Sequence, residues 1–238
     1  DVQDQLIEDI VEVLVNDIVR IREFELSNYI TPRGIGGQIL KSGKQTITVR
    51  MYPVGNLINE SLGKENEAPI STLLENSAVA IGVSQIDNRS KKEFADEIKV
   101  MEHNSPTEDG QFAGAGLPYY EYSFDFQAEV PYELEGWSKG QDLRKLDSMK
   151  LEQKAVEFYK MVQQIYVNKD LDSWLKLSFL EEIRIYQALF NSQNEVKKAF
   201  DRERIDFNRD YRILPINQYR VEYGGGGKVV RLVHTNPS

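Results

Sequence analysis

Apolar and polar positions alternate along three stretches in the first 130 residues. In QTITVRM, Ile47, Val49 and Met51 alternate with polar residues up to Pro53, which is the two-residue period of a half-buried strand. The same period recurs at 77–87 and 119–132, through Val79, Ile81 and Val83 and then through Tyr120, Tyr122, Phe124 and Phe126. The segments 55–76 and 102–118 between these strands are interpreted as loops. Several short strands separated by loops predict an antiparallel β-sandwich.

The first apolar segment, residues 6–24, fits two structures. Its isoleucines, valines and leucines can share one face of a helix, yet the segment is rich in β-branched residues, which favour strands. Asn16 and Asp17 lie between two alternating runs, and both residue types tolerate the left-handed backbone of a tight turn. A strand hairpin is the favoured interpretation, with a helix as the alternative.

Residues 148–207 change to the 3.6-residue period of amphipathic helices. Ser148 is the expected N-cap of a first helix, and Asn168-Lys169-Asp170 interrupts the pattern before a second. Ser192 and Glu195 have the spacing of a capping box, in which each side chain accepts from the other residue's backbone amide. Three helices are therefore expected.

The stretch YGGGGKVVRL, from Tyr223 to Leu232, resembles a phosphate-binding loop only superficially. When Lys228 is aligned with the lysine of that motif, Glu222 replaces its first glycine and Val229 replaces its hydroxyl residue. A hairpin turn between alternating strands is expected instead. Two-residue turns need only one or two glycines, so four glycines indicate a longer loop or a backbone that another group approaches closely.

Composition shifts in GWSKGQDLRKLD, residues 136–147, and this segment is the expected domain boundary. The predicted fold class is α+β with two domains. Residues 1–140 are expected to form an acidic, jelly-roll-like antiparallel β-sandwich, and residues 145–238 a three-helix region that ends in a β-hairpin.

Two stretches resemble known families. IGGQILKSGKQTITVRMYP, residues 35–53, resembles the jelly-roll accessory domains of bacterial glycoside hydrolases, which implies a sandwich and, through exposed loop aromatics, sugar binding. FYKMVQQIYVNKDLDSWLKL, residues 158–177, is similar to the paired opening helices of nuclear-transport-factor-2-like folds. That second resemblance implies a curved sheet after the helices.

Charge is unevenly distributed along the chain. Residues 1–144 contain 25 acidic and 13 basic side chains, whereas residues 145–238 contain 13 acidic and 16 basic ones. Nucleic-acid binding needs clustered lysine and arginine, so no nucleic-acid partner is expected. An acidic domain suits a basic protein partner, although the charge can equally serve solubility.

No run of about 18 apolar residues exists, so no transmembrane segment is expected. The acidic first 25 residues lack the pattern of a retained signal peptide. Bacterial cytoplasm and periplasm both remain open as locations. The chain contains no cysteine, which excludes disulfides and thiolate chemistry.

No catalytic, cofactor-binding or metal-binding residue is predicted from the sequence. The two histidines, His103 and His234, fall in different predicted domains. Asn168, Asp170 and Asp172 imitate the start of a calcium loop, but the required glycine and glutamate are missing, so helix capping is favoured there.

Three aromatic residues, Tyr119, Tyr120 and Trp137, are the candidate partner contacts, because tyrosine and tryptophan are enriched at binding surfaces. The leading functional hypothesis is a non-enzymatic bacterial protein that binds a protein partner, in the manner of an immunity or inhibitor protein. A carbohydrate-binding or glycan-processing accessory role is the alternative. A hydrolase that uses carboxylates alone is the third hypothesis.

Overall fold

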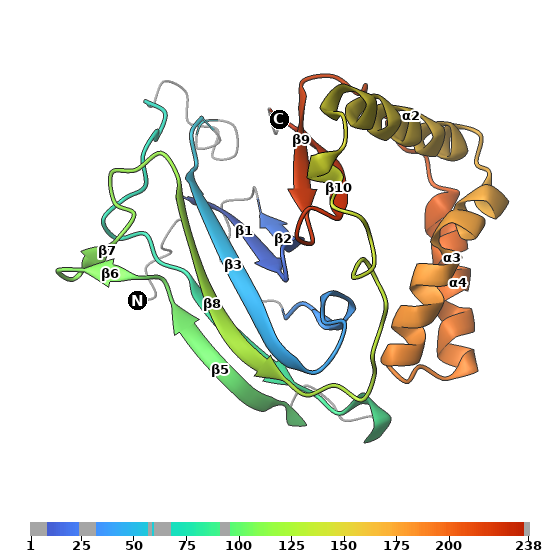
Figure 1. Ribbon diagram of the computed structural model, residues 1–238, viewed down its shortest axis with the longest axis horizontal. Helices are drawn as coiled ribbons and strands as arrows, with labels where there is room; N and C mark the ends of the chain where they lie inside the picture. The colour runs from blue at the N-terminus through green and yellow to red at the C-terminus, as the bar shows by residue number, and fades with distance from the viewer. Residues whose placement is uncertain (1–8, 24–31, 57–58, 60–67, 91–95, 236–238) are drawn as a thin grey trace. The chain divides into compact units, whose positions relative to one another are not determined.

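The structure is a computed structural model that describes residues 9–23, 32–56, 59, 68–90 and 96–235 (Figure 1). It is a mixed α+β protein with several antiparallel sheets and with its helices mainly in the C-terminal part. The chain divides into two compact units, Asp1–Val130 and Pro131–Ser238. Each unit is described by itself.

The first unit begins with a hairpin, which confirms the favoured interpretation of the first segment. Strands β1 (Asp9–Val15) and β2 (Ile18–Glu23) pair antiparallel. Asn16 and Asp17 form the turn with φ angles of 51° and 64°, the left-handed values that a two-residue hairpin requires. The Asn16 side chain donates to the Gln38 carbonyl at 2.8 Å and to Gln45 Oε1 at 2.7 Å, and accepts from the Thr46 amide at 3.1 Å. These bonds attach the turn to distant parts of the chain.

A four-stranded sheet with the order β2-β1-β3-β8 carries the core of this unit (Figure 1). Strands β3 (Gly43–Pro53) and β8 (Tyr120–Ala128) are antiparallel, with Val49 opposite Tyr122. Both predicted alternations are confirmed, since the apolar residues of each strand point to one face. That face contributes to a core cluster that includes Val13, Val15, Ile47, Val49, Met51, Tyr122 and Phe126.

Two smaller hairpins accompany the sheet. β4 (Ala80–Gln85) pairs with β5 (Ile98–Asn104), and β6 (Thr107–Glu108) pairs with β7 (Gln111–Phe112). β4 confirms the strand expected at 77–87, and its Val83 joins the core cluster. The His103 ring of β5 stacks on Phe124 of β8 at 4.0 Å, so the β4–β5 hairpin packs on the apolar face of the sheet.

The interpretation of residues 102–118 as a loop is wrong in part, because β5 ends and β6 and β7 lie there. β5 escapes detection because it is mostly exposed, with Ile98 66% accessible, and therefore lacks an apolar alternation. The β6–β7 turn could have been predicted, because Asp-Gly is a dipeptide typical of tight hairpin turns. Asp109 and Gly110 have the positive φ angles of such a turn, 49° and 85°. The jelly-roll sandwich stays a prediction, since outside the four-stranded sheet the described strands form only two-stranded hairpins.

The second unit contains α2 (Ser148–Val167), α3 (Leu171–Ala188) and α4 (Gln193–Phe207). The expectation that Ser148 caps the first helix is wrong. Asp147 is the N-cap, and its carboxylate accepts from the Lys150 amide at 3.0 Å. Asp170 caps α3 by accepting from the Ser173 amide, which confirms the predicted capping role. The predicted capping box between Ser192 and Glu195 is present at the start of α4.

The glycine stretch is a hairpin loop, as predicted. β9 (Tyr219–Gly224) and β10 (Val229–His234) pair antiparallel, with Gly224 opposite Val229. Gly225, Gly226 and Gly227 have φ angles of 59°, 68° and 86°, which glycine adopts without the penalty that a Cβ carries.

Residues from the expected domain boundary lie against this loop. A Cβ added to Gly225 would lie 2.6 Å from Cδ1 of Trp137, and one added to Gly227 would lie 2.3 Å from Nε of Arg144. The Leu143 amide donates to the Gly227 carbonyl at 2.8 Å, and Arg144 Nη2 donates to the Gly226 carbonyl at 2.9 Å. The division of the chain after Val130 therefore places residues 137–144 with the second unit.

Candidate binding surfaces

The described residues contain no grouping of three or more histidine, aspartate or glutamate side chains that could hold a metal ion. Within the same residues, no helix combines the length and the apolar character needed to cross a membrane.

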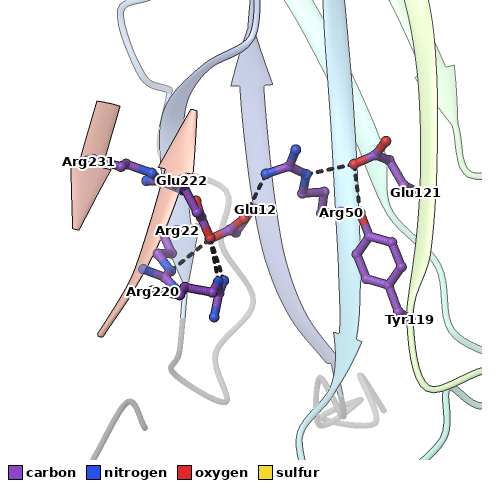
Figure 2. Close-up of polar contacts among 8 residues, drawn as sticks. All are labelled: Glu12, Arg22, Arg50, Tyr119, Glu121, Arg220, Glu222 and Arg231. Carbon is purple, nitrogen blue, oxygen red and sulfur yellow. Dashed lines mark hydrogen bonds and ion pairs between the residues drawn. The ribbon is translucent and has the colours of Figure 1, made fainter. Parts of the chain in front are cut away.

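A row of alternating charges crosses the four-stranded sheet from one edge to the other. Arg22, Glu12, Arg50 and Glu121 occupy directly opposed positions on β2, β1, β3 and β8. Arg22 Nε lies 2.8 Å from Glu12 Oε1, Arg50 Nη1 lies 3.7 Å from Glu12 Oε2, and Arg50 Nε lies 2.7 Å from Glu121 Oε2. Figure 2 shows Arg50 reaching toward both carboxylates. We call these four residues the charged row.

The two carboxylates of the row differ in exposure. The Glu12 side chain is 1% exposed, whereas the Glu121 side chain is 41% exposed. A buried carboxylate is tolerated when opposite charges compensate its desolvation, and Glu12 has two arginines. The buried part of the row therefore serves the sheet itself, and the Glu121 end is available to a ligand.

Tyr119, one of the three predicted contacts, lies at this exposed end. Its hydroxyl donates to Glu121 Oε2 at 2.6 Å, and its ring centroid lies 5.1 Å from that of Tyr52 (Figure 2 shows Tyr119 beside Glu121). Burial, followed by the bond to Glu121, raises the pKa of Tyr119 above its ordinary value. The same bond, followed by that from Arg50, holds the pKa of Glu121 below its usual range. The pair therefore stays as a neutral phenol and a carboxylate at neutral pH.

Two further pairs of polar side chains link β3 and β8 on the same face of the sheet. Thr48 and Ser123 share a hydrogen bond of 2.8 Å, and Thr46 Oγ1 donates to Asp125 Oδ1 at 2.7 Å. Lys44 Nζ also contacts Asp125 Oδ2 at 2.7 Å. We call these five residues, together with Arg50 and Glu121, the polar ladder. Its side chains are held by one another on the outer face of the sheet.

The other two predicted contacts occupy different positions. Tyr120 is half-buried, packs against the core cluster and makes an edge contact with Phe112 at 5.1 Å. Trp137 is half-buried against Gly225 in the second unit. Tyr119 and Tyr120 thus belong to the first unit, and Trp137 belongs to the second. Tyr119 is the one that lies on an open face with polar neighbours.

The second unit carries a smaller charged group on its hairpin. Glu222 accepts from Arg220 Nε at 2.9 Å and from Arg231 Nε at 3.0 Å (Figure 2). Burial opposes ionisation of Glu222, but the bonds and charges of the two arginines outweigh it and lower its pKa. Glu222 and Arg231 face each other in register, which is the usual stabilising arrangement of a cross-strand pair.

The helices of the second unit expose a further surface that the sequence analysis did not identify. Leu180 is 67% exposed, Phe179 is 47% exposed, and both lie on α3. Leu175, Phe179 and Leu180 line a shallow hollow of about 420 Å³ with Asp172 and Lys176. The helical period of this segment predicted the helix, but it did not show which apolar residues of α3 stay exposed.

The charged row and the polar ladder also escaped the sequence analysis. Arg50, Glu121 and Asp125 all fall at the polar positions of predicted strands, and that pattern was the available signal. Which charges meet depends on the register of strands that lie 71 residues apart along the chain, as for Arg50 and Glu121.

Comparison of the chain with known protein families, with curated proteins and with solved structures finds no match.

Proposed function

We propose that this protein is a non-enzymatic binding protein and that its first unit engages a protein partner through the polar ladder and Tyr119. The partner is a basic protein, and the role is of the immunity or inhibitor type. The observation that carries the proposal is the exposed end of the charged row, where Tyr119, Arg50 and Glu121 are held together on an open sheet face.

Preorganisation supports this choice of surface. Association costs free energy for each flexible side chain that it immobilises. The ladder side chains already hold one another through bonds of 2.6–2.8 Å, so less of that cost remains when a partner binds. Tyrosine and arginine are also the residue types most enriched among energetically dominant interface contacts.

The charge of the unit supports a basic partner. Residues 1–130 contain 22 acidic and 11 basic side chains, a net charge of −11. A negative field of this size accelerates the encounter with a positive surface and weakens as salt screens it.

The test combines site-specific crosslinking with a salt titration. A photo-crosslinking amino acid is placed at Tyr119 and, as a matched control, at the exposed Glu108 on the β6–β7 hairpin of the same unit. In a lysate of the source organism, a basic protein is expected to crosslink from position 119 and not from position 108. Its affinity, measured with purified components, is expected to fall by about tenfold or more between 50 and 500 mM salt, as screening removes charge steering.

Variants then test the surface itself. Tyr119→Ala is expected to weaken the captured partner by about tenfold or more, as truncation of a central aromatic contact does, and Glu108→Ala is expected to leave binding unchanged. Equal crosslinking from both positions, or an affinity that is independent of salt, would contradict the proposal.

A carbohydrate ligand is the second candidate, and the Tyr52–Tyr119 pair favours it. The two ring centroids are 5.1 Å apart with an interplanar angle of 44°, beside the hydroxyl and carboxylate groups of the ladder. An aromatic face next to fixed polar groups suits a sugar ring, which has both C–H faces and hydroxyls. A glycan array should then give hits that Tyr119→Ala abolishes and salt does not affect. An array without hits would reject this candidate.

A further inference from the structure

One carboxylate oxygen of the polar ladder has no hydrogen-bond donor among the described residues. Arg50 Nε and the Tyr119 hydroxyl both donate to Oε2 of Glu121, at 2.7 and 2.6 Å. Within the part of the chain that the structure describes, no hydrogen bond or ion pair ends on Glu121 Oε1. Figure 2 shows this second oxygen pointing away from both donors. The two bonds to Oε2 therefore fix the direction in which Oε1 can accept.

The other carboxylate of the ladder is occupied on both sides. Asp125 accepts from Thr46 Oγ1 on Oδ1 and contacts Lys44 Nζ through Oδ2, each at 2.7 Å. Glu121 keeps one oxygen without a donor, and its side chain is 41% exposed. Glu121 Oε1 is therefore the strong acceptor that the ladder leaves for a ligand.

A protein that covers this face must supply a donor to that oxygen. Covering Glu121 removes water from Oε1, and a carboxylate oxygen that is buried without a donor is costly. A charged donor forms a shorter and stronger bond to a carboxylate than a neutral donor does. Arg50 does not remove this preference, because it lies between Glu12 and Glu121 and its side chain is 23% exposed. The more exposed charge at this end is thus the carboxylate, which calls for a cation.

The neighbouring aromatic ring favours a guanidinium over an ammonium. Tyr119 is 40% exposed, and its ring centroid lies 5.1 Å from that of Tyr52, so the ring is supported while part of it stays open. A guanidinium is planar, stacks on aromatic rings and is more weakly hydrated than the ammonium of lysine. It also has five N–H donors, so it can donate to Oε1 while it stacks on the ring.

We propose that the partner inserts an arginine side chain here, whose guanidinium donates to Glu121 Oε1 and stacks on the exposed part of the Tyr119 ring. The inference rests on the proposed function, and it narrows the partner from a basic protein to one with an arginine in its contact surface. Arginine and tyrosine are both enriched among the contacts that dominate interface energies.

NMR titration of the isotope-labelled full chain tests the inference with a small probe. N-acetyl-arginine amide carries one guanidinium and no other charge, and at constant ionic strength it is expected to shift the backbone amides of residues 119–121 with a saturable, millimolar Kd. The citrulline analogue has a similar shape without the charge and is expected to bind about tenfold more weakly or less. The lysine analogue keeps the charge but not the plane, and is expected to bind about threefold more weakly.

Variants assign the probe to its contacts. Glu121→Gln keeps an acceptor for Arg50 and Tyr119 but places an amide N–H at the Oε1 position, and is expected to weaken probe binding by about tenfold or more. Tyr119→Leu removes the ring and is expected to weaken it by about threefold. Glu108→Gln, at an exposed carboxylate of the β6–β7 hairpin, makes the same change in net charge and should leave the probe Kd unchanged. Circular dichroism verifies that each variant stays folded.

The outcomes separate this inference from the proposed function. Equal Kd values for the arginine and citrulline probes, or equal effects of Glu121→Gln and Glu108→Gln, would overturn the inference. If the probe leaves residues 119–121 unshifted while a basic protein still crosslinks from position 119, the inference fails and the proposed function stands. If neither the probe nor a basic protein binds there, both fail.

Discussion

The contact between Trp137 and Gly225 predicts a specific stability difference between neighbouring glycines. Gly225 and Gly226 both have left-handed φ angles, 59° and 68°. A Cβ at Gly225 would lie 2.6 Å from Cδ1 and 2.8 Å from Nε1 of Trp137, whereas a Cβ at Gly226 would have no heavy atom within 4 Å. The pair therefore separates backbone strain from steric overlap.

The magnitudes follow from these two terms. Alanine in the left-handed region costs about 1–2 kcal/mol, so Gly226→Ala is expected to lower the free energy of unfolding by that amount. Gly225→Ala adds the displacement of the Trp137 ring, an overpacking term of about 1–3 kcal/mol. Urea unfolding followed by tryptophan fluorescence measures both variants, because the chain's two tryptophans, Trp137 and Trp174, belong to the second unit.

A double variant provides the control. Trp137→Ala is destabilising by itself, but in its presence Gly225→Ala should cost only as much as Gly226→Ala, because the overlapping ring is gone. Coupling of this kind is expected for residues in contact and not for distant, independent sites. Equal losses for the two glycine variants in the native background, or additive losses with Trp137→Ala, would refute the close packing of this loop.

Three more predictions concern the rest of the chain. Asn16→Gly should lower the free energy of unfolding by about 1–3 kcal/mol, because the side-chain hydrogen bonds are lost. Asn16→Ala should cost about 1 kcal/mol more, because alanine is strained at a positive φ. Unchanged midpoints of urea unfolding for these variants would contradict this. The depressed pKa of Glu121 gives stability that is present above its unfolded pKa of about 4.3 and is lost as pH falls through the lower folded value. Tyr119→Phe should raise the folded pKa and shift this loss to higher pH, as an NMR titration can show; an unmoved titration would exclude the hydrogen bond. Ser192→Ala should cost about 1 kcal/mol through loss of the capping box, while Ser192→Asp retains most of it, as thermal unfolding can verify.

Local sequence signals explain most elements of the fold. The alternation in β3 and β8, the turn at Asn16-Asp17 and the capping box at Ser192 each depend on residues close together in the chain, and each is present as predicted. The missed strand β5 shows the limit of this reasoning. An exposed strand has no apolar period to detect, and its pairing with β4 depends on contacts elsewhere.

The candidate surfaces were less predictable than the elements that bear them. Tyr119 was selected for its residue type and lies at the open end of the charged row, but Tyr120, selected on the same ground, packs against the core cluster. Their opposite environments follow from strand alternation once the inner face is known. Trp137 was expected near a linker, and its ring lies against a loop 88 positions later in the sequence.

The sequence by itself determined the alternating strands β3, β4 and β8, the three helices, the acidic character of the first unit and the lack of cysteine. Composition and short-range periodicity suffice for these features. Only the tertiary structure decided that Arg22, Glu12, Arg50 and Glu121 form one row, and that the glycines of YGGGGKVVRL accommodate Trp137 and Arg144. The physical reason is that strand register and loop packing are set by many contacts between distant residues. A pattern of neighbouring residues therefore does not predict them.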